Sequence, residues 1–455
     1  MKLTFYGGVG EVTGANYLVE SGPSAGSGQV TRILVDCGLH QGEHFSSQHN
    51  WEQFAYDPKT IDAVFVTHAH IDHTGRLPKL VKDGLKGKVY STPPTRDFGN
   101  VLLLDSEHVL LQEAERTKQP PLYGVREVEE LMARWEGIPY HQPMHIGSLT
   151  ITLYNSAHIL GASIVVVEGD GKKIAFTGDL GNSPAPLLGS YETLEALGID
   201  YAVIESAYGD RLHQPVPNGI IEDTIEETVK AGGTLMIPAF AMERTQQLLF
   251  DINELADHGR IPKVPVFLDS PLAIKVTDIF KRYPKYFDQK TKALLKEDLL
   301  LFDFPGLQKT LTTDDSKRIN EIKPPKVIIA GSGMSQGGRI LHHEKRYLPD
   351  PKSTILFVGY QARGSLGRRI QEGQPIVMIH GEKIPVRCRI VSVEGFSAHA
   401  DQRQLLAWIE PMRFTLKHVF VVQGEEEGSQ VLATKIVDDF AVKAEIPPLN
   451  QVIDL

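Results

Sequence analysis

Residues 65–75 read FVTHAHIDHTG, and this stretch decides how the rest of the chain is interpreted. Three histidines and an aspartate fall within six positions, directly after an apolar run that is typical of a buried strand. Packing so many titratable groups at one strand end would cost several kcal/mol in desolvation and repulsion unless a cation neutralised them. The stretch therefore predicts a metal site that includes His68, His70, Asp72 and His73.

The same pattern recurs elsewhere in the chain, where a polar residue follows an apolar run. Buried strands fix backbone positions, while the loops at their ends are free to carry chemistry. If these strand ends share one sheet edge, their side chains meet in a single cleft. The residues placed in this way are Asp36, His158, Asp179, Glu205, His399 and Gln423.

The donor atoms in this set are imidazole nitrogens and carboxylate oxygens, and no thiolate is indicated. Such donors suit zinc, with manganese or iron as alternatives. One tetrahedral ion needs about four ligands, so the set is too large for a single ion, and a bridging carboxylate would let two ions share it. Two ions roughly 3.5–4 Å apart activate water and clamp the oxygens of an in-line displacement. We therefore expect two zinc ions, with manganese as the alternative.

The organisation of the chain predicts an insertion. The first third reads as short strands separated by Gly and Asp turns. From about residue 208, four strand–loop–helix units follow, and alternating units with apolar strands favour a parallel, Rossmann-like sheet. A strand-rich pattern returns after about residue 383. We therefore predict a first domain formed by residues 1–207 and 383–455, with residues 208–382 inserted into it.

Bulk properties limit the location and the partners. The chain has 455 residues but only two cysteines, Cys37 and Cys388, which fits a reducing compartment. No apolar run approaches the roughly 20 residues of a membrane span, and no signal peptide is expected. We therefore expect a cytoplasmic protein without a membrane partner. The net charge of −10 gives no global attraction for nucleic acid, so a polyanion would need a local basic groove.

These motifs resemble a known family. The pattern HxHxDH at residues 68–73 is the signature of the metallo-β-lactamase superfamily, and Asp36, His158 and Asp179 match its other metal motifs in order. ESAYGDR and FSAHAD, which contain Glu205 and His399, resemble two motifs of the β-CASP branch, the nucleases. The chain is most similar to the cleavage-and-polyadenylation-specificity-factor-like RNases of bacteria and archaea. The resemblance implies an α/β fold, an αββα metallo-β-lactamase sandwich with an inserted Rossmann-like β-CASP domain.

The resemblance also implies a function, the metal-dependent hydrolysis of phosphodiester bonds in single-stranded RNA by an activated hydroxide. It assigns His68, His70 and His158 to one metal. Asp72 and His73 help to hold the other, Asp179 bridges, and Asp36 orients the site. His399, poised by Glu205, would protonate the leaving oxygen, which is general acid catalysis. The residues that it assigns to catalysis are Asp72, Glu205 and His399.

One position departs from the family pattern. RNA-processing members carry a histidine before Gly-Glu, but here Gln423 precedes Gly424 and Glu425. Because an amide oxygen is a weaker zinc ligand than imidazole, we predict weaker binding of the second metal. Gln423 motivates an alternative, a catalytically weakened RNA-binding or scaffold subunit. A third reading is a hydrolase of a small ester or lactam, although such a substrate needs no second lobe.

The stretch GSGMSQGG at residues 331–338 lies between an apolar run and a helical pattern. Its backbone N–H groups could cradle a phosphate, or the stretch could be a close-packed turn. The predicted RNA contacts are Ser332, Gly333, Arg339 and Arg363. A homodimer is left open, as are endonucleolytic and exonucleolytic cleavage.

Overall fold

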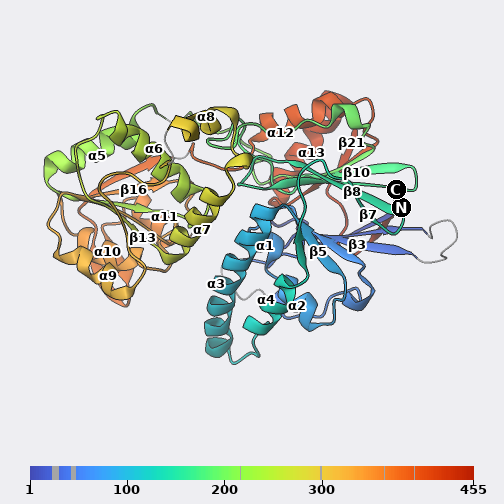
Figure 1. Ribbon diagram of the computed structural model, residues 1–455, viewed down its shortest axis with the longest axis horizontal. Coiled ribbons are helices and arrows are strands. Elements are labelled where there is room, and N and C mark those ends of the chain that lie inside the picture. Colours follow the sequence, from blue (N-terminus) through green and yellow to red (C-terminus); the bar gives the residue numbers. More distant parts are fainter. Residues whose placement is uncertain (23–29, 42–47, 216, 298–299, 363, 394) are drawn as a thin grey trace. The chain divides into compact units, whose positions relative to one another are not determined.

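A computed structural model describes residues 1–22, 30–41, 48–215, 217–297, 300–362, 364–393 and 395–455 (Figure 1). They form two compact units: residues 1–212 with 398–455 make the first unit, and residues 213–397 make the second. The predicted domain limits stay a prediction. The second unit includes residues 383–397, since β19 (Arg389–Val393) pairs in parallel with β16 (Thr354–Val358).

The first unit contains two seven-stranded sheets. The first sheet has the order β22-β1-β2-β3-β4-β5-β6, and the second has the order β21-β20-β11-β10-β9-β8-β7. Strands of the first sheet are β1 (Lys2–Gly7), β2 (Asn16–Ser21), β3 (Thr31–Val35), β4 (Ala63–Phe65), β5 (Lys88–Ser91), β6 (Trp135–Gly137) and β22 (Val452–Asp454). Strands of the second are β7 (Met144–Ile146), β8 (Leu149–Asn155), β9 (Ser163–Gly169), β10 (Lys172–Phe176), β11 (Tyr201–Glu205), β20 (His418–Val422) and β21 (Lys443–Glu445).

Apolar side chains from both sheets form one core between them. Phe5 and Phe65 of the first sheet pack in the same cluster as Phe176 and Phe420 of the second. Helices cover the two outer faces (Figure 1). The outer face of the first sheet carries α2 (Leu77–Lys82), α3 (Pro93–Thr117) and α4 (Val125–Met132), and that of the second carries α12 (Gln402–Ile409) and α13 (Glu426–Phe440). This layering confirms the predicted αββα sandwich.

The second unit is built on a six-stranded sheet with the order β14-β13-β15-β12-β16-β19, and every pair in it is parallel. The four predicted strand–loop–helix units are confirmed. They are β12 (Thr234–Pro238) with α6 (Arg244–Asp257), β13 (Val266–Asp269) with α7 (Pro271–Arg282), β15 (Lys326–Ala330) with α10 (Ile340–Tyr347), and β16 with α11 (Leu366–Gln371).

The remaining elements of the second unit are short or lie beside this sheet. They are α5 (Ile220–Ala231), α8 (Gln289–Glu297), β14 (Leu307–Lys309), α9 (Thr313–Arg318) and the hairpin of β17 (Ile376–Ile379) and β18 (Glu382–Pro385). Across the described part of the chain, no helix has both the length and the apolar character needed to cross a membrane.

Candidate metal centre

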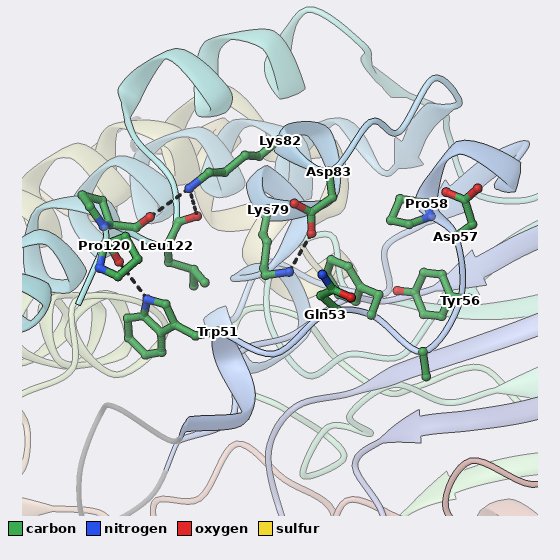
Figure 2. Close-up of a pocket in the computed structure, with 13 residues that line it drawn as sticks. Trp51, Gln53, Tyr56, Asp57, Pro58, Lys79, Lys82, Asp83, Pro120 and Leu122 are labelled. Carbon is green, nitrogen blue, oxygen red and sulfur yellow. Dashed lines mark hydrogen bonds and ion pairs between the residues drawn. The ribbon is translucent and has the colours of Figure 1, made fainter.

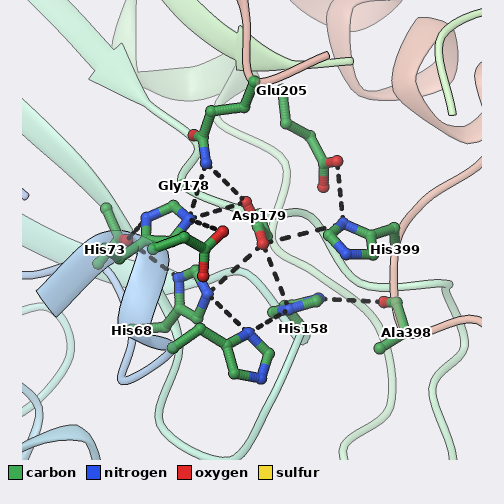
Figure 3. A network of polar contacts seen from close by, with 12 residues as sticks. His68, His73, His158, Gly178, Asp179, Glu205, Ala398 and His399 are labelled. Atoms are coloured by element: carbon green, nitrogen blue, oxygen red, sulfur yellow. Dashed lines mark hydrogen bonds and ion pairs between the residues drawn. The ribbon is translucent and has the colours of Figure 1, made fainter. Parts of the chain in front are cut away.

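The predicted site residues of the first unit meet at one edge of its sandwich (Figure 3). The expectation of a single sheet edge is corrected, since both sheets contribute. Asp36 and His68 follow β3 and β4 of the first sheet, whereas Asp179 and Gln423 follow β10 and β20 of the second. The two sheets pack face to face around a shared core, and this packing brings their strand ends together.

The backbone is unusual where it borders the cluster. Asp36, Ala157 and Gln423 have φ angles of 58°, 54° and 50°, and Gly178 has a φ of 52°. Side-chain-bearing residues rarely adopt this left-handed region, and such strain concentrates at functional sites. Each of these residues turns the chain after a strand, so that the neighbouring polar side chain is aimed into the cluster.

Four side chains converge as one ligand group. Nδ1 of His70 lies 3.1 Å from Nε2 of His68 and 3.2 Å from Nε2 of His158. Oδ2 of Asp179 lies 3.5 and 3.4 Å from those same two Nε2 atoms. A tetrahedral zinc ion with bonds of 2.0–2.1 Å separates its ligand atoms by about 3.3 Å. The spacing of these four side chains therefore fits one ion.

The pKa shifts of the three histidines also fit a metal ion. Burial lowers the pKa of His68 and His158 well below the usual range, and neighbouring imidazoles add to the effect. Burial also lowers the pKa of His70 to about 4. Nδ1 of His158 lies 3.2 Å from the carbonyl oxygen of Ala398, an acceptor that places the ring proton there and leaves Nε2 as a lone pair. Neutral imidazoles with converging lone pairs are the form that a metal binds.

A second group of donors lies on the other side of Asp179. Oδ1 of Asp179 lies 3.3 Å from Nε2 of His73 and 3.3 Å from the amide nitrogen of Gln423. Oδ2 of Asp72 lies 3.7 Å from the same ring nitrogen of His73. The two carboxylate oxygens of Asp179 therefore face two different sets of side chains, which is the arrangement that a bridging ligand requires.

His73 is held by groups behind it. Its Nδ1 donates to Oδ2 of Asp36 at 2.8 Å, and Asp36 also accepts from the backbone N–H and the hydroxyl of Thr67 at 2.8 Å each. Burial lowers the pKa of His73, but three carboxylates, led by Asp179, raise it well above the usual range. Thr67 was missed by the sequence reasoning, although it directly precedes His68 in the quoted stretch.

Gln423 occupies the position that the family pattern gives to histidine. Its side chain is buried, its amide nitrogen lies 2.7 Å from Nε2 of His73, and its amide oxygen accepts from the hydroxyl of Tyr17 at 3.3 Å. The sequence reasoning also missed Tyr17, because only the packing of β2 against the second sheet brings it near Gln423. The amide N–H group thus faces the second donor group, while Tyr17 holds the amide oxygen, so the amide would have to turn over to offer its oxygen to a metal.

His399 and Glu205 form a pair beside the ligand group. Nδ1 of His399 lies 3.0 Å from Oε2 of Glu205, whose Oε1 accepts from the backbone N–H of Leu180 at 2.6 Å. Burial would lower the pKa of His399, but the carboxylate of Glu205 raises it to about 9. Glu205 is fully buried, whereas 28% of the His399 side chain is exposed. Glu205 therefore stabilises the protonated form of an imidazole that reaches solvent.

The predicted RNA contacts lie in the second unit, except that Arg363 falls outside the described residues. Oγ of Ser332 accepts from the backbone N–H groups of Gln336 and Gly337. A Cβ on Gly333 would lie 2.7 Å from the ring of Phe240, so the loop is closely packed. Nη1 of Arg339 donates to Oδ1 of Asp269, the buried last residue of β13, at 2.8 Å.

The sandwich and the cluster at its edge define a metallo-hydrolase with a metallo-β-lactamase fold. Comparison with protein families gives three matches: residues 28–202 match a metallo-beta-lactamase superfamily domain, residues 245–370 a Beta-Casp domain, and residues 383–447 a Zn-dependent metallo-hydrolase RNA specificity domain. The chain belongs to the metallo-β-lactamase superfamily, in the branch that carries a Beta-Casp domain.

Relatives of known name support this membership. Ribonuclease TTHA0252 of Thermus thermophilus is 38% identical over 94% of both chains. Transcription termination factor FttA of Pyrococcus horikoshii is 32% identical, over 98% of this chain and 70% of its own. An RNase J-like protein of Methanocaldococcus jannaschii is 31% identical, over 100% of this chain and 99% of its own. A crystal structure of a protein of unknown function from Enterococcus faecalis shares the fold, with a TM-score of 0.58, 12% identity and coverage of 100% and 99%.

Proposed function

We propose that the protein is a ribonuclease that hydrolyses phosphodiester bonds in single-stranded RNA at a pair of zinc ions. The observation that carries the proposal is Asp179, whose two oxygens face two separate donor groups. Membership of a metallo-hydrolase family, with a relative named ribonuclease at 38% identity, supports the choice of substrate.

In the proposed site, His68, His70 and His158 would hold one ion, and Asp179 would be shared with a second. Zinc, when bound, lowers the pKa of a water molecule and offsets charge on the phosphate. Asp72 and His73, with Gln423 as a weak ligand through its amide oxygen, would hold the second ion, and Asp36 fixes the ring of His73. Manganese is the alternative metal, because carboxylate and imidazole donors also suit it.

His399 is proposed as the general acid. The carboxylate of Glu205 keeps the ring protonated at Nδ1, so Nε2 carries the second proton of the imidazolium. That proton passes to the leaving oxygen of the RNA, and the imidazolium becomes a neutral imidazole. Burial raises the pKa of Glu205, whereas His399 and the backbone N–H of Leu180 stabilise its charged form.

RNA contacts of the second unit are also proposed. Ser332, Gly333, Arg339 and Arg363 are kept as the candidates for phosphate contacts. The rings of Phe240 and Tyr360 are 45% and 49% exposed and follow β12 and β16, two neighbouring strands, so they are candidates for stacking on bases. Each of these roles predicts weaker RNA binding in the alanine variant.

We also propose a cellular setting and an oligomeric state. A cytoplasmic location fits the two buried free cysteines, Cys37 and Cys388. A homodimer is also proposed, and light scattering of the purified chain tests it.

The test of the proposed function compares three substrates with one zinc-loaded preparation: end-labelled single-stranded RNA, the matching DNA, and a chromogenic ester. We expect cleavage of RNA, and the lengths of the labelled products distinguish internal from terminal cleavage. Absence of RNA cleavage with zinc and with manganese would refute the proposal and favour the scaffold alternative. Cleavage of the ester alone would favour a small-substrate hydrolase.

The role of His399 has its own prediction. His399→Ala should lower the RNA cleavage rate by about 10²–10⁴-fold, the range for general acid catalysis. The zinc content should stay unchanged, because His399 is not among the proposed ligands. His380→Ala is the matched control, an exposed histidine of the second unit, and should leave the rate unchanged. Loss of zinc in His399→Ala would instead place this residue among the metal ligands.

A further inference from the structure

We propose that a pocket on the first unit, away from the metal centre, binds one nucleotide of a single-stranded RNA. The inference rests on the proposed function, because it takes RNA as the ligand. None of the candidate metal ligands lines this pocket. The pocket would therefore hold a part of the strand that is not being cleaved.

The pocket lies between residues 51–58, α2 and residues 120–122 (Figure 2). Its volume is about 690 Å³, within the range of pockets that bind small ligands. Its walls combine flat rings with cationic side chains. The lining residues that the argument uses are Trp51, Phe54, Tyr56, Lys79 and Lys82.

The aromatic side of the pocket is fixed in advance. Nε1 of Trp51 donates to the carbonyl oxygen of Pro120 at 2.9 Å, which sets the plane of the indole. The rings of Phe54 and Tyr56 stack with centroids 5.3 Å apart. Bases stack on such rings whatever their identity, because every base has a π-face. The ring of Phe54 is covered by Tyr56 and by Nζ of Lys79, so the indole of Trp51 is the surface offered to a nucleobase, and stacking on it does not select a sequence.

The cations give the pocket a preference for an anion. Nζ of Lys82 donates to the carbonyl oxygens of Pro121 and Leu122 at 2.9 and 3.0 Å. An ammonium has three donors, so these two bonds hold Nζ at the rim with one N–H left for a phosphate oxygen. Nζ of Lys79 lies 4.2 Å from the centre of the Phe54 ring and 2.6 Å from a carboxylate oxygen of Asp83.

The lining carries two lysines and two aspartates, so its formal charges balance, and the preference for an anion rests on the position of Lys82. The carboxylate of Asp83 is paired with Lys79, and that of Asp57 accepts from the backbone N–H of Lys59 at 3.0 Å. Lys82 has no carboxylate partner among the ion pairs of the described residues. A nucleotide has a flat base that can stack on the aromatic side chains and a phosphate that can bind the ammonium group of Lys82. A proline-rich peptide would use the rings but not the ammonium of Lys82.

Tryptophan fluorescence gives a direct readout of this pocket. The chain has three tryptophans, and two of them, Trp135 and Trp408, are buried at 2% and 0% exposure. A base that stacks on the indole of Trp51 should quench its emission. The experiment titrates the zinc-loaded chain with a phosphorothioate-linked oligoadenylate, which resists cleavage, and follows emission.

We expect saturable quenching that Trp51→Phe abolishes. Lys82→Glu should raise the Kd from the quenching titration at least tenfold. Lys86→Glu is the matched control, because Lys86 is exposed and lies outside the pocket, and it should leave the Kd unchanged. Unchanged Trp51 emission at saturating oligoadenylate, or equal effects of the two lysine variants, would overturn the proposal. So would quenching by a proline-rich peptide in place of the oligoadenylate.

The two proposals fail in different ways. Cleavage of unmodified RNA is measured separately on the same preparation. Quenching without cleavage contradicts the proposed function alone, and cleavage without quenching contradicts the pocket alone. Thermal melting of Trp51→Phe and Lys82→Glu shows that both variants are folded.

Discussion

Asp179 in the first unit and Asp269 in the second are both buried carboxylates at the end of a strand, at 3% and 0% exposure. Asp269 accepts from hydroxyls of Thr310 and Ser316 at 2.6 and 2.7 Å, and also from Arg339 and His343. Donors thus fill its lone pairs.

Asp179 has different neighbours. Imidazole nitrogens of His68, His73 and His158 lie 3.3–3.5 Å from its oxygens, and the rings of His68 and His158 have pKa values that keep them neutral. Oδ2 of Asp179 thus faces the ring nitrogens of two neutral imidazoles, an arrangement that a cation would satisfy. Oδ1 differs, because it accepts from the amide of Gln423 and lies beside His73, whose pKa is raised. The comparison teaches that a buried carboxylate beside histidine marks a metal only at the oxygen that lacks proton donors.

Removal of Asp179 should have the largest effect. In Asp179→Ala, zinc binding and RNA cleavage should fall to the level of the metal-free chain, because both donor groups lose their shared carboxylate. Zinc at 1,000 times its Kd stabilises a wild-type protein by about 4 kcal/mol, and the variant should lose this gain. Metal analysis and melting with and without zinc measure both effects. A variant that still melts at a higher temperature with zinc would contradict the assignment.

Removal of Asp269 should affect folding instead. Asp269→Ala leaves Arg339 and His343 without their carboxylate and should cost about 3–5 kcal/mol of unfolding free energy. Zinc content of the folded fraction should stay unchanged. Asp314→Ala, at an 84% exposed side chain in the same unit, should cost less than about 0.5 kcal/mol. Urea unfolding measures the unfolding free energies. Loss of zinc in Asp269→Ala would contradict the proposed difference between Asp269 and Asp179.

The pH dependence of the same residue follows from its hydrogen bonds. Burial raises the pKa of Asp269, but hydrogen bonds, led by that from His343, bring it well below the usual range. A depressed carboxyl pKa stabilises the fold above the unfolded value of about 3.9, and this contribution is lost as the pH falls further. Asp269→Ala should therefore show a shallower loss of stability below pH 4 than the wild type.

Gln423 tests the weaker side of the metal centre. Gln423→His should tighten binding of the second zinc ion by about 10–100-fold, because imidazole is a better ligand than an amide. Gln423→Leu keeps the bulk without a donor and should change affinity in the opposite direction. Competition with a chromogenic chelator measures both. Equal affinities in all three proteins would exclude Gln423 from the ligand set.

Glu344 extends the comparison to a third buried carboxyl group, whose effect is read from the pH dependence of stability. Burial raises its pKa to about 8. Among the described residues, the hydroxyl of Ser335 donates to Oε1, and Oε2 has no hydrogen-bond partner. A raised carboxyl pKa means that folding binds a proton. Stability should therefore fall as the pH rises from about 4.3 toward about 8. Glu344→Gln should flatten this slope in melting curves, and an unchanged slope would contradict it.

Much of the fold follows from local patterns. Apolar runs with Gly and Asp turns gave the strands of the sandwich, and four apolar strands followed by amphipathic helices gave the parallel sheet. The strand at residues 389–393 shows the limit of this reasoning. Its sequence pattern suits either sheet, and only its pairing with β16 places it in the second unit.

The sequence by itself determined the donor types, their spacing in HAHIDH, and the strand ends that carry the other donors. Only the tertiary structure decided which oxygen of Asp179 faces which donors, that Arg339 is paired within its own unit, and that Trp51 faces lysines. The physical reason is the distance along the chain between the residues that interact. Neighbouring residues share a strand or turn whose geometry is local, whereas Asp36 and Gln423 meet the same cluster only because two sheets bury a common apolar core.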